Sequence, residues 1–213
     1  MSSHNRIFDF DTDEAIEHLA ASSVRMRRMM ARVGPFRMQV RPTPSVFAAL
    51  AEAVVYQQLH GKAAATIFDR LCALFPRGKA GLGARALMAI SDADLRGAGL
   101  SQNKLRALRD LAEKSLARQI PTIAQAARLD NEAVIEALTQ VRGIGRWTVE
   151  MLLMFRLGRP DVLPVDDYGI RKGFAITFGK KEMPTPKALA AYGERWAPYR
   201  TIASWYLWRA TEL

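Results

Sequence analysis

Apolar residues recur every three or four positions along almost the whole chain, whereas alternating stretches rich in Val, Ile and Thr are scarce. A period near 3.6 residues puts apolar side chains on one face of a helix, while a period of two is typical of a strand. The pattern therefore predicts an all-α protein. The connections are short, so we expect two packed helical lobes within a single domain of residues 1–213.

Capping and helix-breaking residues set the expected helix boundaries. Ser, Thr and Asp side chains accept hydrogen bonds from the first free amides of a helix, Pro fits its first position, and Gly often follows its end. The N-terminal residues 1–10 are a candidate disordered segment, and helix is expected from about residue 11. Further helices are predicted over residues 44–59, 62–75, 84–90, 92–97, 102–118, 131–140, 145–157, 167–178, 186–195 and 199–211.

Charge narrows the choice of partner. The chain has 31 Lys and Arg against 21 Asp and Glu, a formal net charge of +10. The basic excess is concentrated in residues 62–128 and 142–213. Such a balance favours a polyanionic partner, which is either a nucleic acid or an anionic membrane surface.

Cysteine usage and the N-terminus exclude several classes of protein. Cys72 is the only cysteine, which rules out an intrachain disulfide and a four-cysteine zinc or iron–sulfur site. The N-terminus has no basic stretch followed by an apolar core, and the chain has no apolar run of about 18 residues. We therefore expect a cytoplasmic, nucleoid-associated protein that does not bind membranes.

A membrane-surface role depends on one segment. Residues 24–33 combine four arginines with methionines, and a basic helix with an apolar face can lie on an anionic membrane. Arginines of this kind more often form the solvated face of an ordinary helix. The membrane hypothesis therefore requires the methionines to be exposed.

Residues 131–157 have the pattern of a helix–hairpin–helix motif, in which the turn is Gly143-Ile144-Gly145. The free amides at the start of the second helix and the helix dipole suit a phosphate group, and glycines let a nucleic-acid backbone approach closely. Contacts of this kind hold DNA without reading its sequence. A tight turn between two helices is the simpler alternative.

Four segments carry a resemblance to one family. Residues 141–148 (VRGIGRWT) resemble the hairpin of DNA repair glycosylases, and residues 161–168 (DVLPVDDY) are similar to the Gly/Pro-rich loop and aspartate that define this superfamily. Residues 56–63 (YQQLHGKA) and 196–200 (WAPYR), with Trp205 and Trp208, extend the match. From about residue 45 onward the chain resembles the 3-methyladenine DNA glycosylase II family, in a compact form without its N-terminal β domain.

The resemblance implies an activity and a partner. Members of this family flip alkylated bases such as 3-methyladenine and 7-methylguanine out of DNA and hydrolyse the N-glycosidic bond, which leaves an abasic site. The partner would be double-stranded DNA with alkylated bases, bound by a monomer in a cleft between the two lobes. No cofactor would be required.

The resemblance also assigns the hairpin. Its backbone carbonyls would bind a Na or K ion that links the protein to a phosphate, and its amides would face that phosphate. The carbonyls are those of Thr139, Val141 and Ile144, and the amides are those of Gly143, Gly145 and Thr148.

The Asp166-Asp167 pair supplies the candidate catalytic carboxylate. As a base leaves, positive charge develops on the sugar, and a fixed carboxylate near C1′ stabilises it. An alkylated purine is already cationic, so an acid that protonates it is less necessary. Both residues have a simpler interpretation as helix caps, which Asp favours. The resemblance assigns catalysis to Asp167 and leaves Asp166 as a cap or loop support.

Aromatic and elbow residues are assigned to base flipping by the same resemblance. Trp147, Trp208 and Tyr56 would line the base pocket, since electron-rich rings attract a cationic purine. A helix break puts residues 56–61 on an exposed elbow, where Leu59 would be the wedge that fills the gap in the duplex. His60 and Gln58 would contact the minor groove. Core packing is the alternative for Leu59 and for the tryptophans.

Trp147 also bears on the type of reaction. Bifunctional relatives carry a lysine at this position, whose amine forms a Schiff base with the sugar and then cleaves the strand. Tryptophan predicts a monofunctional enzyme that uses water. A glycosylase and lyase acting on oxidised bases stays an alternative, as does a non-catalytic helix–hairpin–helix DNA-binding module that needs neither Asp167 nor the aromatic residues.

Overall fold

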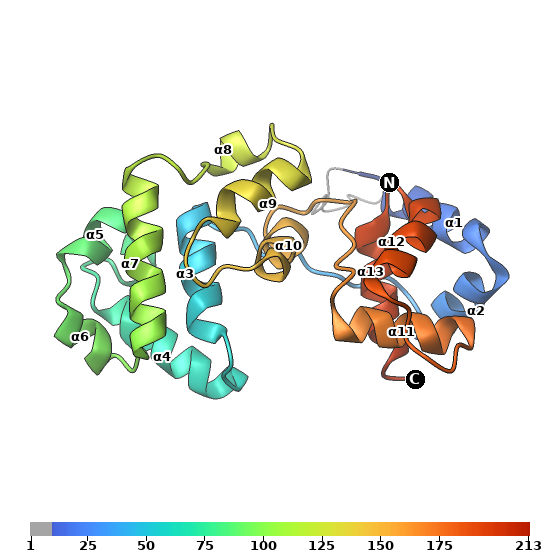
Figure 1. Cartoon of the computed structure of the whole chain (residues 1–213), viewed down its shortest axis with the longest axis horizontal. Helices are drawn as coiled ribbons and strands as arrows, with labels where there is room; N and C mark the ends of the chain where they lie inside the picture. Colours follow the sequence, from blue (N-terminus) through green and yellow to red (C-terminus); the bar gives the residue numbers. More distant parts are fainter. Residues whose placement is uncertain (1–9) are drawn as a thin grey trace, which may run out of the picture. The chain divides into compact units, whose positions relative to one another are not determined.

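A computed structural model describes residues 10–213 of the chain. Within this range the chain forms thirteen α-helices and two short 3₁₀ helices, and no strand (Figure 1). The prediction of an all-α protein is confirmed. The predicted disorder of residues 1–10 falls, apart from Phe10, outside the described residues.

The helices belong to two compact units. Unit 1 combines Met1–Arg41 with Leu153–Leu213, and unit 2 is the continuous segment Pro42–Leu152. Two helical lobes were expected from the sequence, and this division agrees with that expectation. Unit 1 is assembled from both ends of the chain, which no local pattern indicates.

Unit 2 is organised around one long helix, α7 (Gln102–Leu116), which packs against α3 (Val46–Tyr56) and α5 (Ala84–Ala89) (Figure 1). Leu105, Leu108 and Leu111 of α7 are buried, as their helical spacing predicts. The other elements are α4 (Gly61–Ala73), η1 (Gly78–Gly81), α6 (Asp92–Gly97), α8 (Ile123–Ala126), α9 (Asn131–Thr139) and most of α10 (Arg146–Phe155).

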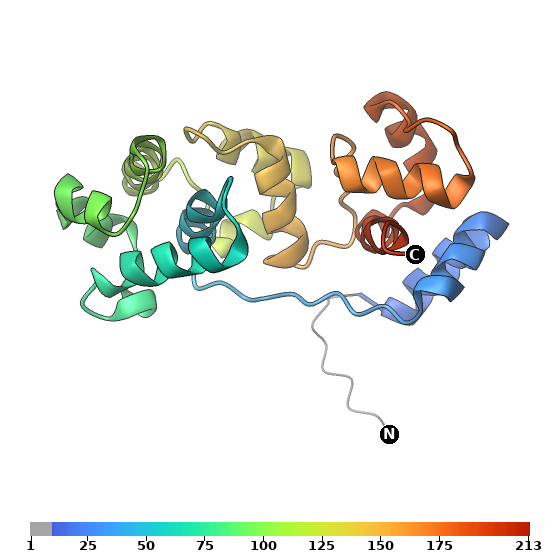
Figure 2. The same ribbon diagram turned by 90° about the horizontal axis from the view of Figure 1, so that it is seen from below.

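Unit 1 is built on the pair α11 (Tyr168–Phe178) and α13 (Arg200–Ala210), which lie side by side in both views (Figures 1 and 2). Gly173 makes this close approach possible, because a Cβ atom there would overlap the carbonyl of Leu207. The other elements are α1 (Thr12–Ser22), α2 (Val24–Val33), α12 (Pro186–Gly193) and η2 (Glu194–Trp196).

The apolar face of α2 lies in the core of unit 1. Met26, Met29 and Met30 are buried in one cluster with Phe174 and Trp196. A membrane-surface role for residues 24–33 requires this face to be exposed, so the hypothesis is wrong. Within residues 10–213, moreover, every helix is too short or too polar to cross a membrane.

Several helices begin at the predicted residues, each after a side chain of a capping type. Ser91, Ser101 and Asp130 each accept a hydrogen bond from an amide in the first turn of the helix that follows. The helix predicted from residue 44 begins later, because Ser45 caps α3 by accepting from the amide of Ala48. The helix expected over 44–59 is therefore shorter at both ends.

Candidate active site and DNA interface

The elbow between α3 and α4 exposes the side chains that the sequence assigns to the DNA gap. Gln58 has a φ of 57°, in the left-handed region, so the chain leaves α3 abruptly after Tyr56. Leu59 is 39% exposed, which excludes core packing for it. His60 precedes α4 but makes no capping hydrogen bond with its ring. These exposures suit the wedge and groove roles of Gln58, Leu59 and His60, which stay predictions.

The hairpin turn depends on one glycine conformation. Gly143 has a φ of 76°, which L side chains rarely adopt, and its added Cβ would lie 3.6 Å from Cβ of Ala107. The helices on either side are joined by Arg146, whose guanidinium binds Glu132 of α9 and the buried Glu150 of α10. The hydrogen bond with Glu132 raises the pKa of Arg146 and lowers that of the Glu132 carboxyl.

Helix α7 supports both the elbow and the hairpin. Lys104 Nζ donates to the Val55 carbonyl at the end of α3, 2.6 Å away. Two turns further along, Asp110 Oδ2 accepts from the Arg142 amide at 2.7 Å. Gln57 then joins the two loops directly, because its Nε2 donates to the Gly143 carbonyl at 2.9 Å.

Burial and hydrogen bonding shift the pKa of both supporting side chains on α7. Desolvation by burial lowers the pKa of the Lys104 ammonium. Burial alone would raise the pKa of the Asp110 carboxyl, but the Arg142 amide and the Lys114 ammonium outweigh it and lower that pKa below its ordinary value. The Asp110 carboxyl is therefore ionised when it accepts the hydrogen bond from the Arg142 amide of the hairpin.

The hairpin amides differ in their availability. Within the described part of the chain, the amides of Gly143 and Gly145 make no hydrogen bond, so they can donate to a phosphate. The Thr148 amide, by contrast, donates to the Gly145 carbonyl at 3.0 Å. The first turn of α10 therefore already uses the Thr148 amide in this geometry, and its assignment to the phosphate stays a prediction.

The three carbonyls assigned to a monovalent cation fit that group. No hydrogen bond from the described residues reaches the Thr139 or Ile144 carbonyl, and the Val141 carbonyl accepts only one, from the Ile144 amide at 3.0 Å. A carbonyl oxygen has two lone pairs, so each of the three retains a free one. Residues 10–213 contain no cluster of three or more His, Cys, Asp or Glu side chains that would hold a metal ion instead.

Asp167 is fixed at the start of α11 by two hydrogen bonds to the same oxygen. Its Oδ1 accepts from the Ile170 amide and from the Trp208 indole N–H, each at 2.8 Å. Asp167 is thus the N-cap of α11, where the helix dipole favours a negative charge. Asp166 is exposed and does not cap the helix, so its expected role as a cap is wrong, while its role in loop support stays a prediction.

Trp208 has a role that the sequence did not indicate. Its indole stacks on Phe155, with ring centroids 5.9 Å apart and an interplanar angle of 27°, and its N–H orients Asp167. A half-buried ring in this position fixes the carboxylate. Its predicted role as a wall of the base pocket stays a prediction.

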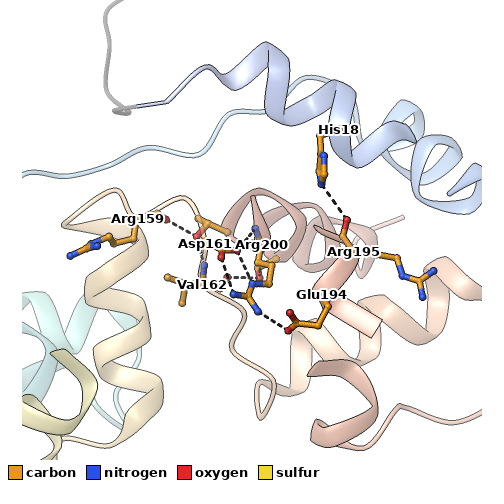
Figure 3. A network of polar contacts seen from close by, with 9 residues as sticks. His18, Arg159, Asp161, Val162, Glu194, Arg195 and Arg200 are labelled. Atoms are coloured by element: carbon orange, nitrogen blue, oxygen red, sulfur yellow. Dashed lines mark hydrogen bonds and ion pairs between the residues drawn. The ribbon is translucent and has the colours of Figure 1, made fainter. Parts of the chain in front are cut away.

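The loop that leads to Asp167 is clamped to the start of α13 (Figure 3). The Arg200 guanidinium donates to both carboxylate oxygens of Asp161, at 2.7 and 2.8 Å, and reaches Glu194 at 3.0 Å. Thr201 Oγ1 donates to the Arg159 carbonyl and accepts from the Val162 amide. The hydrogen bond with Asp161 raises the pKa of Arg200. Helix α13 therefore positions the loop at one end and Asp167 at the other.

Three aromatic side chains near these loops are exposed. Trp147 at the start of α10 is 50% exposed and Tyr56 is 37% exposed, so neither is a core residue. Tyr168, directly after Asp167, is 65% exposed and was not singled out from the sequence. Its position next to Asp167 in the sequence could have identified Tyr168 as a candidate site residue. Trp196, in contrast, is fully buried and belongs to the core.

Comparison with known proteins identifies the class. Residues 51–198 match the sequence profile of the HhH-GPD superfamily of base excision DNA repair proteins, which covers more than half of the chain. The chain therefore belongs to this superfamily.

Individual relatives are similar over nearly the whole chain. DNA-3-methyladenine glycosylase 1 of Schizosaccharomyces pombe is 40% identical over 202 residues, which are 92% of this chain and 86% of the relative. A solved 3-methyladenine DNA glycosylase of Schizosaccharomyces pombe in complex with abasic DNA has a TM-score of 0.81 at 38% identity, covering 94% of this chain and 97% of that chain. A DNA-3-methyladenine glycosidase from Bacillus halodurans has a TM-score of 0.84 at 35% identity, covering 94% and 91%.

Proposed function

We propose that this protein is a monofunctional DNA glycosylase that removes alkylated bases from double-stranded DNA during base excision repair. The names of the relatives at 35% to 40% identity support this substrate class. The observation that carries the proposal is the Asp167 carboxylate, which the Ile170 amide and the Trp208 indole hold in one orientation.

The reaction needs one fixed negative charge and one water molecule. The C1′–N bond breaks, the electron pair leaves with the base, and the cationic 3-methyladenine group becomes neutral. Asp167 stabilises the positive charge that remains on the sugar. Water then adds to C1′ and loses a proton, which gives an abasic site and a free base.

The exposed aromatic side chains supply base recognition in this proposal. Trp147, Tyr56 and Tyr168 each present a ring to solvent, and a cationic purine is attracted to an electron-rich ring by stacking and by cation–π contact. Leu59 fills the gap that the flipped base leaves, with Gln58 and His60 beside it. The selectivity for alkylated bases then comes from their charge.

The hairpin holds the DNA backbone. The free amides of Gly143 and Gly145 donate to a phosphate, and the carbonyls of Thr139, Val141 and Ile144 would bind a Na or K ion. That ion would supply a positive charge between the carbonyls and the phosphate. We infer that one monomer serves one lesion.

Base release from methylated duplex DNA tests the proposal. Wild type should release 3-methyladenine and 7-methylguanine, detected by chromatography, while Asp167→Asn should bind the same duplex and release far less. If wild type binds DNA but releases no base, the non-catalytic DNA-binding module becomes the better account.

The monofunctional reaction has a separate test. A lysine amine would form a Schiff base that borohydride reduces to a covalent protein–DNA adduct. With Trp147 in place of that lysine, borohydride should trap no adduct. An adduct on DNA containing an oxidised base would instead support the lyase alternative.

A further inference from the structure

Unit 1 contains a strongly basic pocket that the proposed reaction does not use. It has a volume of about 790 Å³ and is lined by the four arginines Arg37, Arg41, Arg156 and Arg209, with no carboxylate in its lining. Its apolar wall includes Phe155 and Trp205. Four arginines and no acidic residue in one lining favour an anion as the ligand.

The segment that carries two of these arginines is fixed by its backbone. The Arg41 amide donates to the Phe155 carbonyl at 2.8 Å, so the segment is tied to the end of α10. The side chains of Arg37 and Arg41 are exposed, and neither makes an ion pair or hydrogen bond with the described residues. They are held near the cavity without a carboxylate to neutralise them.

The pocket shares an aromatic wall with the candidate catalytic carboxylate. Phe155 lines the pocket and stacks on Trp208, whose indole N–H donates to Asp167. Arg209 follows Trp208 in α13 and pairs at the surface with Glu212 at 3.2 Å. The stacked rings of Phe155 and Trp208 therefore connect the basic pocket to Asp167.

We propose that this arginine pocket binds a phosphate of the DNA backbone next to the nucleotide whose sugar faces Asp167. The inference rests on the DNA binding in the proposed function. The phosphates of a nucleotide flank its sugar, so an anion site beside the carboxylate suits them. A guanidinium matches a phosphate with two parallel hydrogen bonds. A cationic methylated purine would be repelled by four arginines, so the base itself belongs elsewhere.

The salt dependence of DNA binding tests the proposal. Each lost phosphate contact makes the plot of log K for DNA association against log salt concentration less steep by about 0.9. Loss of a charged hydrogen bond of this kind also weakens DNA affinity by about tenfold. Arg37→Gln/Arg41→Gln should show both effects on a duplex with an abasic-site analogue, while Arg37→Lys/Arg41→Lys should retain most of the slope. Ethylation interference should identify the phosphate that the Gln variant no longer contacts.

A matched control removes the same charge from another face of unit 1. Arg27 and Arg28 are exposed on α2 and do not line the pocket, so Arg27→Gln/Arg28→Gln should leave binding within about twofold, because screened distant charges contribute little. An equal loss in both pairs, or no loss in the pocket pair, would overturn the proposal. These measurements use no base release, so they stand or fall separately from the glycosylase reaction.

A free phosphate ion or a nucleoside monophosphate could bind the same pocket in place of a DNA phosphate. Calorimetry of the DNA-free protein with inorganic phosphate and with a deoxynucleoside monophosphate distinguishes it. Weak or absent binding of both, together with a reduced DNA slope in Arg37→Gln/Arg41→Gln, is the expected result. Tight binding of either anion that this variant abolishes, with an unchanged DNA slope, would assign the pocket to a small phosphate instead.

Discussion

The two units offer DNA different chemistry. Unit 2 presents main-chain groups, namely the free amides of Gly143 and Gly145 and the carbonyls around them. Unit 1 presents side chains, namely the Asp167 carboxylate and the arginines of the pocket. Main-chain groups hold any phosphate, whereas a fixed carboxylate acts on one bond. The main-chain groups of unit 2 should therefore contribute to binding alone, whereas unit 1 should carry base release together with the phosphate contact proposed for its arginine pocket.

Each unit also has one helix that supports its site. In unit 2, α7 holds the elbow through Lys104 and the hairpin through Asp110. In unit 1, α13 holds the loop before α11 through Arg200 and orients Asp167 through Trp208. Changes in α7 should therefore weaken DNA binding, and changes in α13 should slow the reaction.

The largest effect is expected at Asp167. Asp167→Asn keeps the cap geometry but removes the charge, so the single-turnover rate of base release should fall by about a hundredfold to a thousandfold. The dissociation constant for duplex DNA should change little, as measured by fluorescence anisotropy. A large loss of binding in this variant would contradict the division between the units.

The next largest effect is expected in the clamp on the loop before α11. Arg200→Ala removes two hydrogen bonds to Asp161, which is about three-quarters buried, so the free energy of unfolding should fall by about 2 kcal/mol. Base release should also slow because Asp167 loses its support. Urea unfolding and single-turnover kinetics measure the two effects.

Glu194→Ala is the control for this clamp. Glu194 also pairs with Arg200 but is 68% exposed, so its loss should change stability by less than about 1 kcal/mol. An effect as large as that of Arg200→Ala would mean that Asp161 is not the partner that matters.

The two hairpin glycines should separate stability from binding. Gly143→Ala forces alanine into a left-handed conformation and should cost about 1–2 kcal/mol of folding free energy. At Gly145 a Cβ would meet no atom within 4 Å, so Gly145→Ala should leave stability nearly unchanged and weaken DNA binding by obstructing the backbone. Thermal unfolding and anisotropy of both variants check this. Equal destabilisation would contradict the geometry.

The smallest effect is expected at Asp110, whose ionised carboxyl stabilises the hairpin and loses that effect at low pH. The folded-state pKa of Asp110 lies below its ordinary value of 3.8, so its ionised form contributes stability above about that pH. That stability is lost as pH falls through the lowered pKa. Asp110→Asn should therefore be less stable than wild type by about 1 kcal/mol at pH 7, with the difference shrinking below pH 4. A difference that is constant with pH would show that the charge is not involved.

Features that depend on neighbouring residues were predictable from the sequence. The hairpin follows from two glycines between helical segments, and the caps at Ser101 and Asp130 follow from side chains that reach the next turn. The helix start predicted at residue 44 was wrong because Thr43, Pro44 and Ser45 are three adjacent start signals and only packing selects Ser45. Helix α8 was missed because four residues are too few for a periodic pattern.

Features that depend on distant residues were not predictable in the same way. Asp167 was selected by family resemblance, while its partner Trp208 lies 41 positions away in the sequence. Asp110 supports Arg142 from 32 positions away, and the arginines of the pocket come from both ends of the chain. Only the packing of helices brings these groups together. The hydrogen bond of the Thr148 amide to Gly145 was equally hidden, because it depends on where α10 begins.

The most direct test of the account measures binding and chemistry together in two variants. Base release under single turnover, followed over a series of enzyme concentrations, gives a maximal rate and a half-saturation value for wild type, Asp167→Asn and Gly145→Ala. Asp167→Asn should lose rate at an unchanged half-saturation value, while Gly145→Ala should need more enzyme to reach an unchanged rate. If both substitutions changed the same quantity, binding and base release would not be separate properties of the hairpin and the carboxylate.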